Sequence, residues 1–249
     1  MTQLSAVTFD LWQTLVVDDR ERGRARTGVR IQGALEALAG AGLSYTEEQI
    51  REAYRQCYRT CHSVRQEGLD VSFSEQVRVF LDALAPGLRD RLGPQTVAQV
   101  ATAYGDGSFF AFPPPLAEGV PDLLQQLREA GYPLALISNV GATPGVTFRR
   151  YLAQHGILDY FSVLIFSDEV QLTKPSPKIF AATLELLGAT PAQTVHVGDH
   201  LLNDVAGAKR AGLWSVWLEG FDDGKQVEAP DVTVSSLRQV AAAIAGLAG

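Results

Sequence analysis

The chain has 249 residues, of which 46% are hydrophobic, so it is long enough to bury a sizeable core in one large domain or two small ones. Its 28 acidic residues outnumber its 21 basic residues and give a net charge of −7, which argues against nucleic acid or an anionic membrane surface as the main partner. No basic and then apolar leader opens the sequence, and the apolar tail at residues 240–248 is shorter than the roughly 20 residues that cross a bilayer. We therefore expect a cytoplasmic protein.

The first predicted strand, at residues 6–9, ends directly before Asp10. Ligands in open α/β sheets bind at the carboxyl ends of the strands, so Asp10 is placed like a reactive group. An aspartate after a strand is also a common turn residue. A reactive role for Asp10 is favoured only if other polar residues of the chain lie at the same edge of the sheet.

Residues 18–112 show helical patterns and no convincing strand. Apolar residues recur at helical spacing at residues 29–38, 47–61, 74–84 and 96–104. Three consecutive prolines at 113–115 cannot continue a helix and mark the end of this region. The only two cysteines, Cys57 and Cys61, would lie one turn apart on the second helix, which suits neither a disulfide nor, with His62, a complete zinc site. We expect both cysteines to be small buried side chains.

Helical and strand patterns alternate from residue 120 onward. Helices are predicted at residues 120–127, 146–154, 179–187 and 204–211, and the strands that follow them at residues 134–137, 163–166, 194–197 and 214–218. This alternation predicts an α/β fold with a doubly wound parallel sheet covered by helices on both faces. We predict a Rossmann-like core domain formed by residues 1–17 and 113–249, and a helical cap domain formed by residues 18–112.

Polar groups follow four of the predicted strands, at the edge of the sheet where ligands are held. They are Asp10, Ser138, Asn139, Lys174, Asp199 and Asp204. Each group alone would be an ordinary turn, cap or surface residue. Lys174 is the first lysine in a chain whose every earlier cation is an arginine, which favours a specific need for an ammonium group there.

Taken in order, these motifs resemble those of the haloacid dehalogenase (HAD) superfamily of hydrolases. The resemblance spans the whole chain, including a helical cap inserted after the first motif. It implies a hydrolase with a small-molecule substrate and with Asp10 as the nucleophile. It also implies a Mg²⁺ ion bound by Asp10, by the main-chain carbonyl of Trp12 and by Asp199, with Asp204 supporting the metal.

The physical logic of such a site can be stated for this chain. A carboxylate such as Asp10 can split one difficult displacement into two easier ones through a covalent intermediate, and a divalent cation would manage its charge. Lys174 would neutralise developing negative charge, and Ser138 would donate a hydrogen bond to a transferring oxygen. Thr14 would fix the loop after Asp10 by local hydrogen bonding. Thr14 and Asn139 would also join Ser138 and Lys174 in binding the substrate. We predict a Mg²⁺-dependent phosphohydrolase of a small phosphorylated metabolite that forms an aspartyl-phosphate on Asp10.

Trp12 departs from the pattern, because phosphatases of the superfamily usually carry an aspartate there as the acid and base. Indole can perform neither task, and a positioned acid or base is worth roughly 10²- to 10⁴-fold in rate. We therefore expect Trp12 to contact the substrate without transferring a proton. Acyl and aryl phosphates should then react better than alkyl phosphates.

Two alternatives remain open. The 2-haloacid dehalogenases of the superfamily carry an aromatic residue at the position of Trp12 and work without a metal through an aspartyl ester, although they replace the aspartate found here at position 199. The arginines at 51, 55 and 59 could form a halide cradle or a solvated helix face. The other alternative is a catalytically weak binding or regulatory protein with the same fold.

Other polar and aromatic residues have simpler interpretations. His196 lies inside a predicted strand, which favours a core residue over a ligand, and the resemblance gives His200 no necessary role. The mixed charges of residues 18–26 favour a solvated face over an anion clamp. The phenylalanines at 109, 110 and 112 are expected to pack the hinge rather than line the cleft. The sequence predicts neither the substrate nor the oligomeric state.

Overall fold

The computed structural model of the protein describes residues 4–222, 224 and 227–248. Its centre is a six-stranded sheet in which every pairing is parallel, in the order β3-β2-β1-β4-β5-β6. The strands are β1 (Ala6–Phe9), β2 (Leu134–Ser138), β3 (Phe161–Phe166), β4 (Thr194–His200), β5 (Trp214–Phe221) and β6 (Val232–Val234). The predicted doubly wound α/β fold is confirmed.

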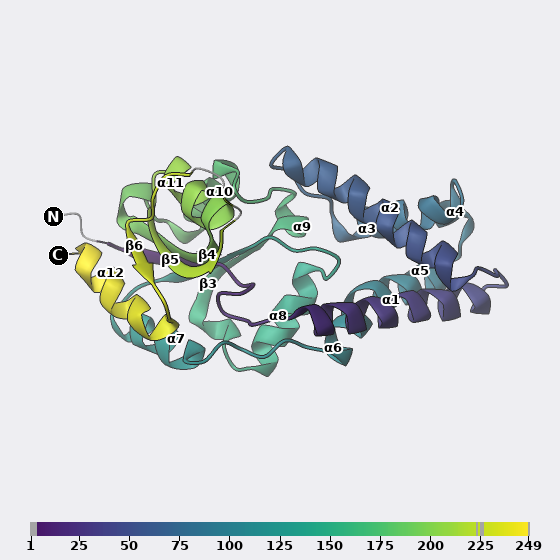
Figure 1. Cartoon of the computed structure of the whole chain (residues 1–249), viewed down its shortest axis with the longest axis horizontal. Coiled ribbons are helices and arrows are strands. Elements are labelled where there is room, and N and C mark those ends of the chain that lie inside the picture. Colours follow the sequence, from purple (N-terminus) through teal and green to yellow (C-terminus); the bar gives the residue numbers. More distant parts are fainter. Residues whose placement is uncertain (1–3, 223, 225–226, 249) are drawn as a thin grey trace.

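Helices cover both faces of the sheet because its strands are apolar on both sides (Figure 1). Every residue of β1 and β2 is buried. One face packs in a common hydrophobic cluster with α7 (Val120–Glu129), α8 (Gly145–Gln154) and α12 (Val240–Ala248). The other face packs with α10 (Pro177–Leu187) and α11 (Gly207–Arg210). Parallel sheets need this double cover.

The helices at residues 20–111, here called the helical unit, extend away from the sheet along the long axis of the molecule (Figure 1). The helical unit has its own apolar cluster, to which α1, α2, α3 and α5 contribute. It contains α1 (Arg20–Gly40), α2 (Glu47–Gln66), α3 (Phe73–Leu84), α4 (Leu88–Arg91), α5 (Pro94–Thr102), a π-helical turn at Ala103–Gly107 and α6 (Ser108–Ala111). The exact domain boundaries at residues 17/18 and 112/113 stay predictions.

Local capping explains where the long helices begin. The side chain of Asp19 accepts a hydrogen bond from the amide of Arg22 at the start of α1. Thr46 and Gln49 form a reciprocal capping box at the start of α2. Such caps satisfy amides that have no partner inside the helix.

Cys57 and Cys61 lie one turn apart on α2, where both are free and buried. Their Sγ atoms are 4.0 Å apart, so the prediction of small buried side chains is confirmed. Within the described residues, no helix combines the length and the apolar character that a membrane crossing requires.

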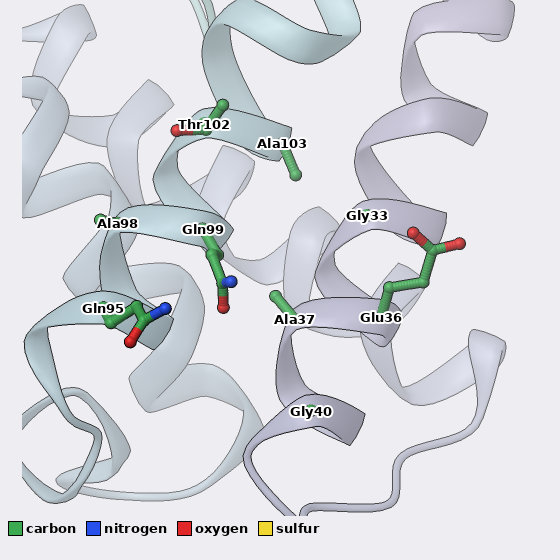
Figure 2. Close-up of a pocket in the computed structure, with 9 residues that line it drawn as sticks. All are labelled: Gly33, Glu36, Ala37, Gly40, Gln95, Ala98, Gln99, Thr102 and Ala103. Atoms are coloured by element: carbon green, nitrogen blue, oxygen red, sulfur yellow. The ribbon is translucent and has the colours of Figure 1, made fainter.

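A groove of about 590 Å³ separates parts of α1 and α5 and is lined mainly by glycine, alanine and glutamine (Figure 2). The helices approach closely at one end of it, where a Cβ atom on Gly33 would lie 2.5 Å from the Cβ of Ala103. Among the described residues that line the groove, Glu36 alone is ionisable. The groove therefore offers no cluster of groups for chemistry.

The strand order places the predicted site at a topological switch point. The chain runs outward from β1 through β2 to β3, and then returns to the other side of β1 with β4. Phe9 is in register with Val197, so Asp10 and Asp199 leave neighbouring strands at the same edge. Ligands of open α/β sheets bind where the strand order reverses in this way.

Candidate active site

Asp10 is held by the turn that follows β1. Its amide donates to the carbonyl of Val197 at 2.9 Å, which continues the pairing of β1 with β4. Gln13 takes a left-handed conformation with φ 59°, and the chain folds back so that the Thr14 hydroxyl donates to Oδ2 of Asp10 at 3.2 Å. Thr14 is fully buried. Thr14 therefore makes a local hydrogen bond that joins the loop to the Asp10 carboxylate.

Asp199 and Asp204 lie beside Asp10 and form a buried acidic cluster with it. One carboxylate oxygen from each of the three residues lies within 4.8 Å of the others. Two glycines make room for this cluster. A Cβ atom on Gly198 would lie 2.4 Å from Cγ of Asp204, and one on Gly220 would lie 2.8 Å from Cβ of Asp199.

Lys174 reaches into this cluster and is itself buried. Its Nζ donates to Oδ1 of Asp10 at 2.5 Å and to Oδ1 of Asp204 at 2.7 Å. The Asn139 side chain fixes the main chain of Lys174 on both sides, because its Nδ2 donates to the Lys174 carbonyl and its Oδ1 accepts from the Lys174 amide. The structure therefore uses the Asn139 side chain to position Lys174.

Ser138 ends β2 and is fully buried. Its Oγ has no hydrogen-bond partner within the part of the chain that the structure describes. A buried hydroxyl without a partner costs free energy, so an acceptor that reached it would be stabilised. Ser138 is thus a donor available to a ligand.

The carboxyl groups of the cluster ionise at unusual pH values. Burial raises the pKa of Asp10 to about 6, against the attraction of Lys174. Burial, together with repulsion from Asp10 and Asp204, raises the pKa of Asp199 to about 7. Burial also opposes the charge on Asp204, but Lys174 and His196 outweigh it and lower the pKa of Asp204. The pKa of Lys174 is raised, because attraction to Asp10 and Asp204 outweighs the effect of burial.

Three supporting contacts are not predicted from the sequence. His196 is a buried strand residue, as expected, but its Nε2 also lies 3.2 Å from Oδ1 of Asp204. The amide of His200 donates to Oδ2 of Asp204 at 2.9 Å. The indole of Trp217 donates to the carbonyl of Asp199 at 2.7 Å. Residues 196 and 217 lie in apolar strand sequences, so their polar contacts could not be predicted from the sequence.

Trp12 packs among aromatic rings beside the site. Its ring meets Phe148 and Phe109 edge to face, at centroid distances of 5.5 and 6.5 Å. Phe109 is fully buried, in agreement with the predicted packing role. The guanidinium of Arg26 lies 5.9 Å from the Trp12 ring and pairs with Asp18. Arg26 is therefore a buried packing residue, which differs from the solvated face predicted for residues 18–26.

Comparison with known proteins identifies the family. Residues 4–212 match the model of the haloacid dehalogenase-like hydrolases. The chain belongs to this family. It is 30% identical over 244 residues to glyceraldehyde 3-phosphate phosphatase of Methanopyrus kandleri, and the match covers 95% of each chain. It is also 32% identical over 152 residues to phosphoglycolate phosphatase of Pseudomonas putida, covering 60% of this chain and 53% of the relative.

Solved structures share the fold of this hydrolase. A 2-haloacid dehalogenase from Pseudomonas syringae pv. Tomato superposes with a TM-score of 0.72 at 22% identity, covering 98% of this chain and all of the other. A HAD phosphatase from Thermococcus onnurineus superposes with a TM-score of 0.60 at 24% identity, covering 98% and 99%. At these identities the likeness concerns the fold alone.

The arginines of α2 considered for a halide cradle pair with glutamates of the same helix. Their side chains are between 38% and 62% exposed. The pairs are Arg51 with Glu47, Arg55 with Glu48 and Glu52, and Arg59 with Glu52. Such an arrangement is typical of a solvated helix face.

A pocket of about 830 Å³ lies between the end of α2 and the site loops of the hydrolase. Asn139 and Lys174 line it from the core, and Arg65 lines it from the helical unit. Arg210 adds a further cation, and Glu67 is the one acidic residue among the described residues of the lining. Basic side chains thus outnumber acidic ones around Lys174.

Proposed function

We propose that the protein is a Mg²⁺-dependent phosphohydrolase that acts on a small phosphorylated metabolite through an aspartyl-phosphate on Asp10. The observation that carries this proposal is the buried cluster of Asp10, Asp199 and Asp204 with Lys174 inserted into it. Such a cluster combines a nucleophile, a cation site and a fixed positive charge. The hydroxyl of Ser138, which lacks a partner among the described residues, adds a hydrogen-bond donor.

The cluster fits a hard divalent cation. When all three buried carboxylates are ionised, they outnumber the Lys174 ammonium by two charges. Oxygen ligands from carboxylates are those that Mg²⁺ prefers. Asp10 and Asp199 would hold the ion, with Asp204 and the Trp12 carbonyl as further candidates. When bound, Mg²⁺ would offset the negative charge of the substrate and of the attacking carboxylate.

The residues of the chain then divide the reaction between them. A carboxylate oxygen of Asp10 attacks phosphorus, and the bond from phosphorus to the leaving oxygen breaks with its electron pair staying on that oxygen. Water then attacks phosphorus and loses a proton to the solvent, and the bond from phosphorus to the Asp10 oxygen breaks with its electron pair staying on that oxygen. This releases inorganic phosphate and restores the Asp10 carboxylate. Lys174 and Ser138 would stabilise the charge on the transferring oxygens throughout.

The phosphorylated substrate class is supported by two observations. Relatives are named as phosphatases of glyceraldehyde 3-phosphate and of phosphoglycolate, both of which are small phosphorylated compounds. The charged side chains of the pocket beside Lys174 are also mainly basic, among them Arg65 and Arg210. A basic lining favours an anionic substrate.

Trp12 favours a second candidate, a metal-independent 2-haloacid dehalogenase in which Asp10 attacks carbon. A halide leaves without a proton, so such a reaction has no need for an acid at position 12. Asp199 opposes this candidate, because a reaction without a metal would have to tolerate an additional buried carboxyl group beside the nucleophile. The phosphatase therefore remains the better-supported proposal.

The deciding experiment measures phosphate release from aryl and acyl phosphates and halide release from 2-haloacids, each with Mg²⁺ and with EDTA. We expect phosphate release that requires Mg²⁺ and disappears in Asp10→Asn, because an amide is not a competent nucleophile. Halide release that persists in EDTA would replace this proposal with the dehalogenase. Binding of Mg²⁺ and phosphate analogues without turnover of any substrate would favour a regulatory protein.

A further inference from the structure

The loop between α2 and α3 docks on the core segment that leads into Lys174. Leu69 and Leu172 form an isolated antiparallel bridge. The amide of Asp70 donates to the carbonyl of Gln171 at 3.0 Å. The amide of Thr173, directly before Lys174, donates to the carbonyl of Gly68 at 3.2 Å. In Figure 1 this part of the core, at α9 (Ser167–Val170), lies between the sheet and the helical unit. The helical unit is therefore attached to the chain next to the catalytic lysine.

The side chain of Asp70 makes a second connection, to the loop that carries Ser138. The Asp70 side chain is fully buried. Its Oδ2 accepts from the hydroxyl of Ser167 at 2.5 Å. The same hydroxyl accepts from the amide of Val140 at 2.9 Å, two residues after Ser138. One hydroxyl thus joins the carboxylate of the helical unit to the loop of Ser138.

The other oxygen of Asp70 is occupied within the helical unit. Its Oδ1 accepts from Nε of Arg65 and from the amide of Val71, both at 2.7 Å. Arg65 compensates the buried negative charge, and the two donors fix the plane of the carboxylate. Oδ2 is thereby directed at Ser167.

Asp70 consequently contacts the segment before Lys174 directly and reaches the loop of Ser138 through the hydroxyl of Ser167. The Asn139 side chain already joins these loops, because it bonds the main chain of Lys174. We propose that Asp70 is a positioning residue that couples docking of the helical unit to the alignment of Ser138 and Lys174. This inference rests on the proposed function, since these two groups must meet a transferring phosphoryl group.

The coupling has a simple physical basis. Ser167 is fully buried, and its hydroxyl can keep accepting from Val140 while donating to only one partner. Loss of the Asp70 acceptor would leave the proton of the Ser167 hydroxyl without a partner, so the hydroxyl could rotate. The rotation would weaken its hydrogen bond with the Val140 amide and loosen the loop of Ser138. Small misplacements of catalytic groups can reduce the rate by up to about 10²-fold.

Two substitutions break the connection from opposite sides. Asp70→Asn keeps the shape of the side chain but replaces the oxygen that accepts from the Ser167 hydroxyl with an amide NH₂ group. Ser167→Ala removes the donor to Asp70 from the side of the core and changes no residue of the helical unit. Glu75→Gln is a matched control, because Glu75 is an exposed acid of the helical unit that pairs with Arg78 on its own helix.

We expect Asp70→Asn and Ser167→Ala each to lower kcat by about 10- to 100-fold while KM changes less than about threefold. The double variant should be no slower than the slower single variant, because both changes break one connection. With Mg²⁺ present, binding of orthovanadate, which mimics the transition state of phosphoryl transfer, should weaken in parallel with kcat. Binding of inorganic phosphate should change little, and Glu75→Gln should behave like the wild type.

Hydrogen exchange tests the same inference without turnover. Amides at residues 138–141 and 171–175 should exchange faster in Asp70→Asn and Ser167→Ala, but not in Glu75→Gln. Unchanged exchange at these residues, or kcat losses that multiply in the double variant, would overturn the positioning role of Asp70. If the wild-type protein hydrolyses no phosphate ester, the proposed function fails, whereas the exchange measurement still decides whether Asp70 holds the two loops.

Discussion

The affinity of the site for Mg²⁺ should depend steeply on pH. The metal needs ionised carboxylates, so protons compete with it for Asp10 and Asp199. Their pKa values are raised to about 6 and about 7. Raised pKa values mean that both groups hold protons at mildly acidic pH and lose them as the pH rises. Asp204 has a lowered pKa and stays ionised over this range, so it adds no pH dependence.

The two pKa values set the size of the effect. At about pH 8 both carboxyl groups are ionised, and competition by protons is negligible. At about pH 5 protonation of Asp199 weakens binding by roughly 10²-fold and protonation of Asp10 by roughly another tenfold. We therefore expect the dissociation constant for Mg²⁺ to rise by roughly 10³-fold from about pH 8 to about pH 5, or roughly 4 kcal/mol.

Isothermal titration of the protein with Mg²⁺ across this pH range would measure the effect directly. In the acidic limit the logarithm of the dissociation constant should change by two per pH unit, one for each carboxyl group that must lose a proton. Asp199→Asn is the control, because it removes one titrating ligand and should reduce that slope to one while weakening binding at every pH. A dissociation constant that stays constant over the range, or that falls with acidity, would refute the assignment of these carboxylates to the metal.

Two substitutions near the acidic cluster test its packing and the effect of the absent acid at position 12. Gly198→Ala should lower the free energy of unfolding by about 1–3 kcal/mol, because the new methyl group would overlap the Asp204 carboxylate. Thermal unfolding measures this effect, and an unchanged midpoint would contradict the close approach. Trp12→Asp should raise the turnover of alkyl phosphates more than that of aryl phosphates, since proton transfer contributes roughly 10²- to 10⁴-fold. Trp12→Phe, which keeps the aromatic packing, is its control, and an equal gain on both substrate types would mean that another group supplies the proton.

The succession of strands and helices along the core could be predicted because each strand is a continuous apolar run between helical patterns. The predicted strand at residues 6–9 coincides with β1, and the other four lie within β2 to β5. The short strand β6 was missed, since three residues at an edge carry too weak a pattern. The helix predicted at residues 204–211 instead begins as a π-helical turn at Leu201–Ala206. His200 explains this earlier start, because its Nδ1 accepts hydrogen bonds from the amides of Leu202 and Asn203.

The candidate site was predictable where a polar residue directly follows a strand. Asp10 directly follows β1, and Ser138 and Asp199 lie at the carboxyl ends of β2 and β4; Ser167 directly follows β3 but was not among the predicted residues. Asp70 carried no such signal, because it lies between two helices and reaches the site loops only through the tertiary contact with Ser167. Long-range pairing of this kind cannot be read from local periodicity.

Trp12 and Asp199 together restrict the chemistry more than either residue does alone. Under the proposed function, Asp199 would supply a buried oxygen ligand for a cation, whereas Trp12, packed against Phe148, would stand where an acid would otherwise transfer a proton. A site that keeps the cation ligand and lacks the acid suits a leaving group whose negative charge is stable without a proton. Under the proposed function, the preferred substrates are therefore phosphates of acidic hydroxyl groups, such as acyl phosphates, because the metal, Lys174 and Ser138 can stabilise the phosphoryl group but cannot protonate an alkoxide.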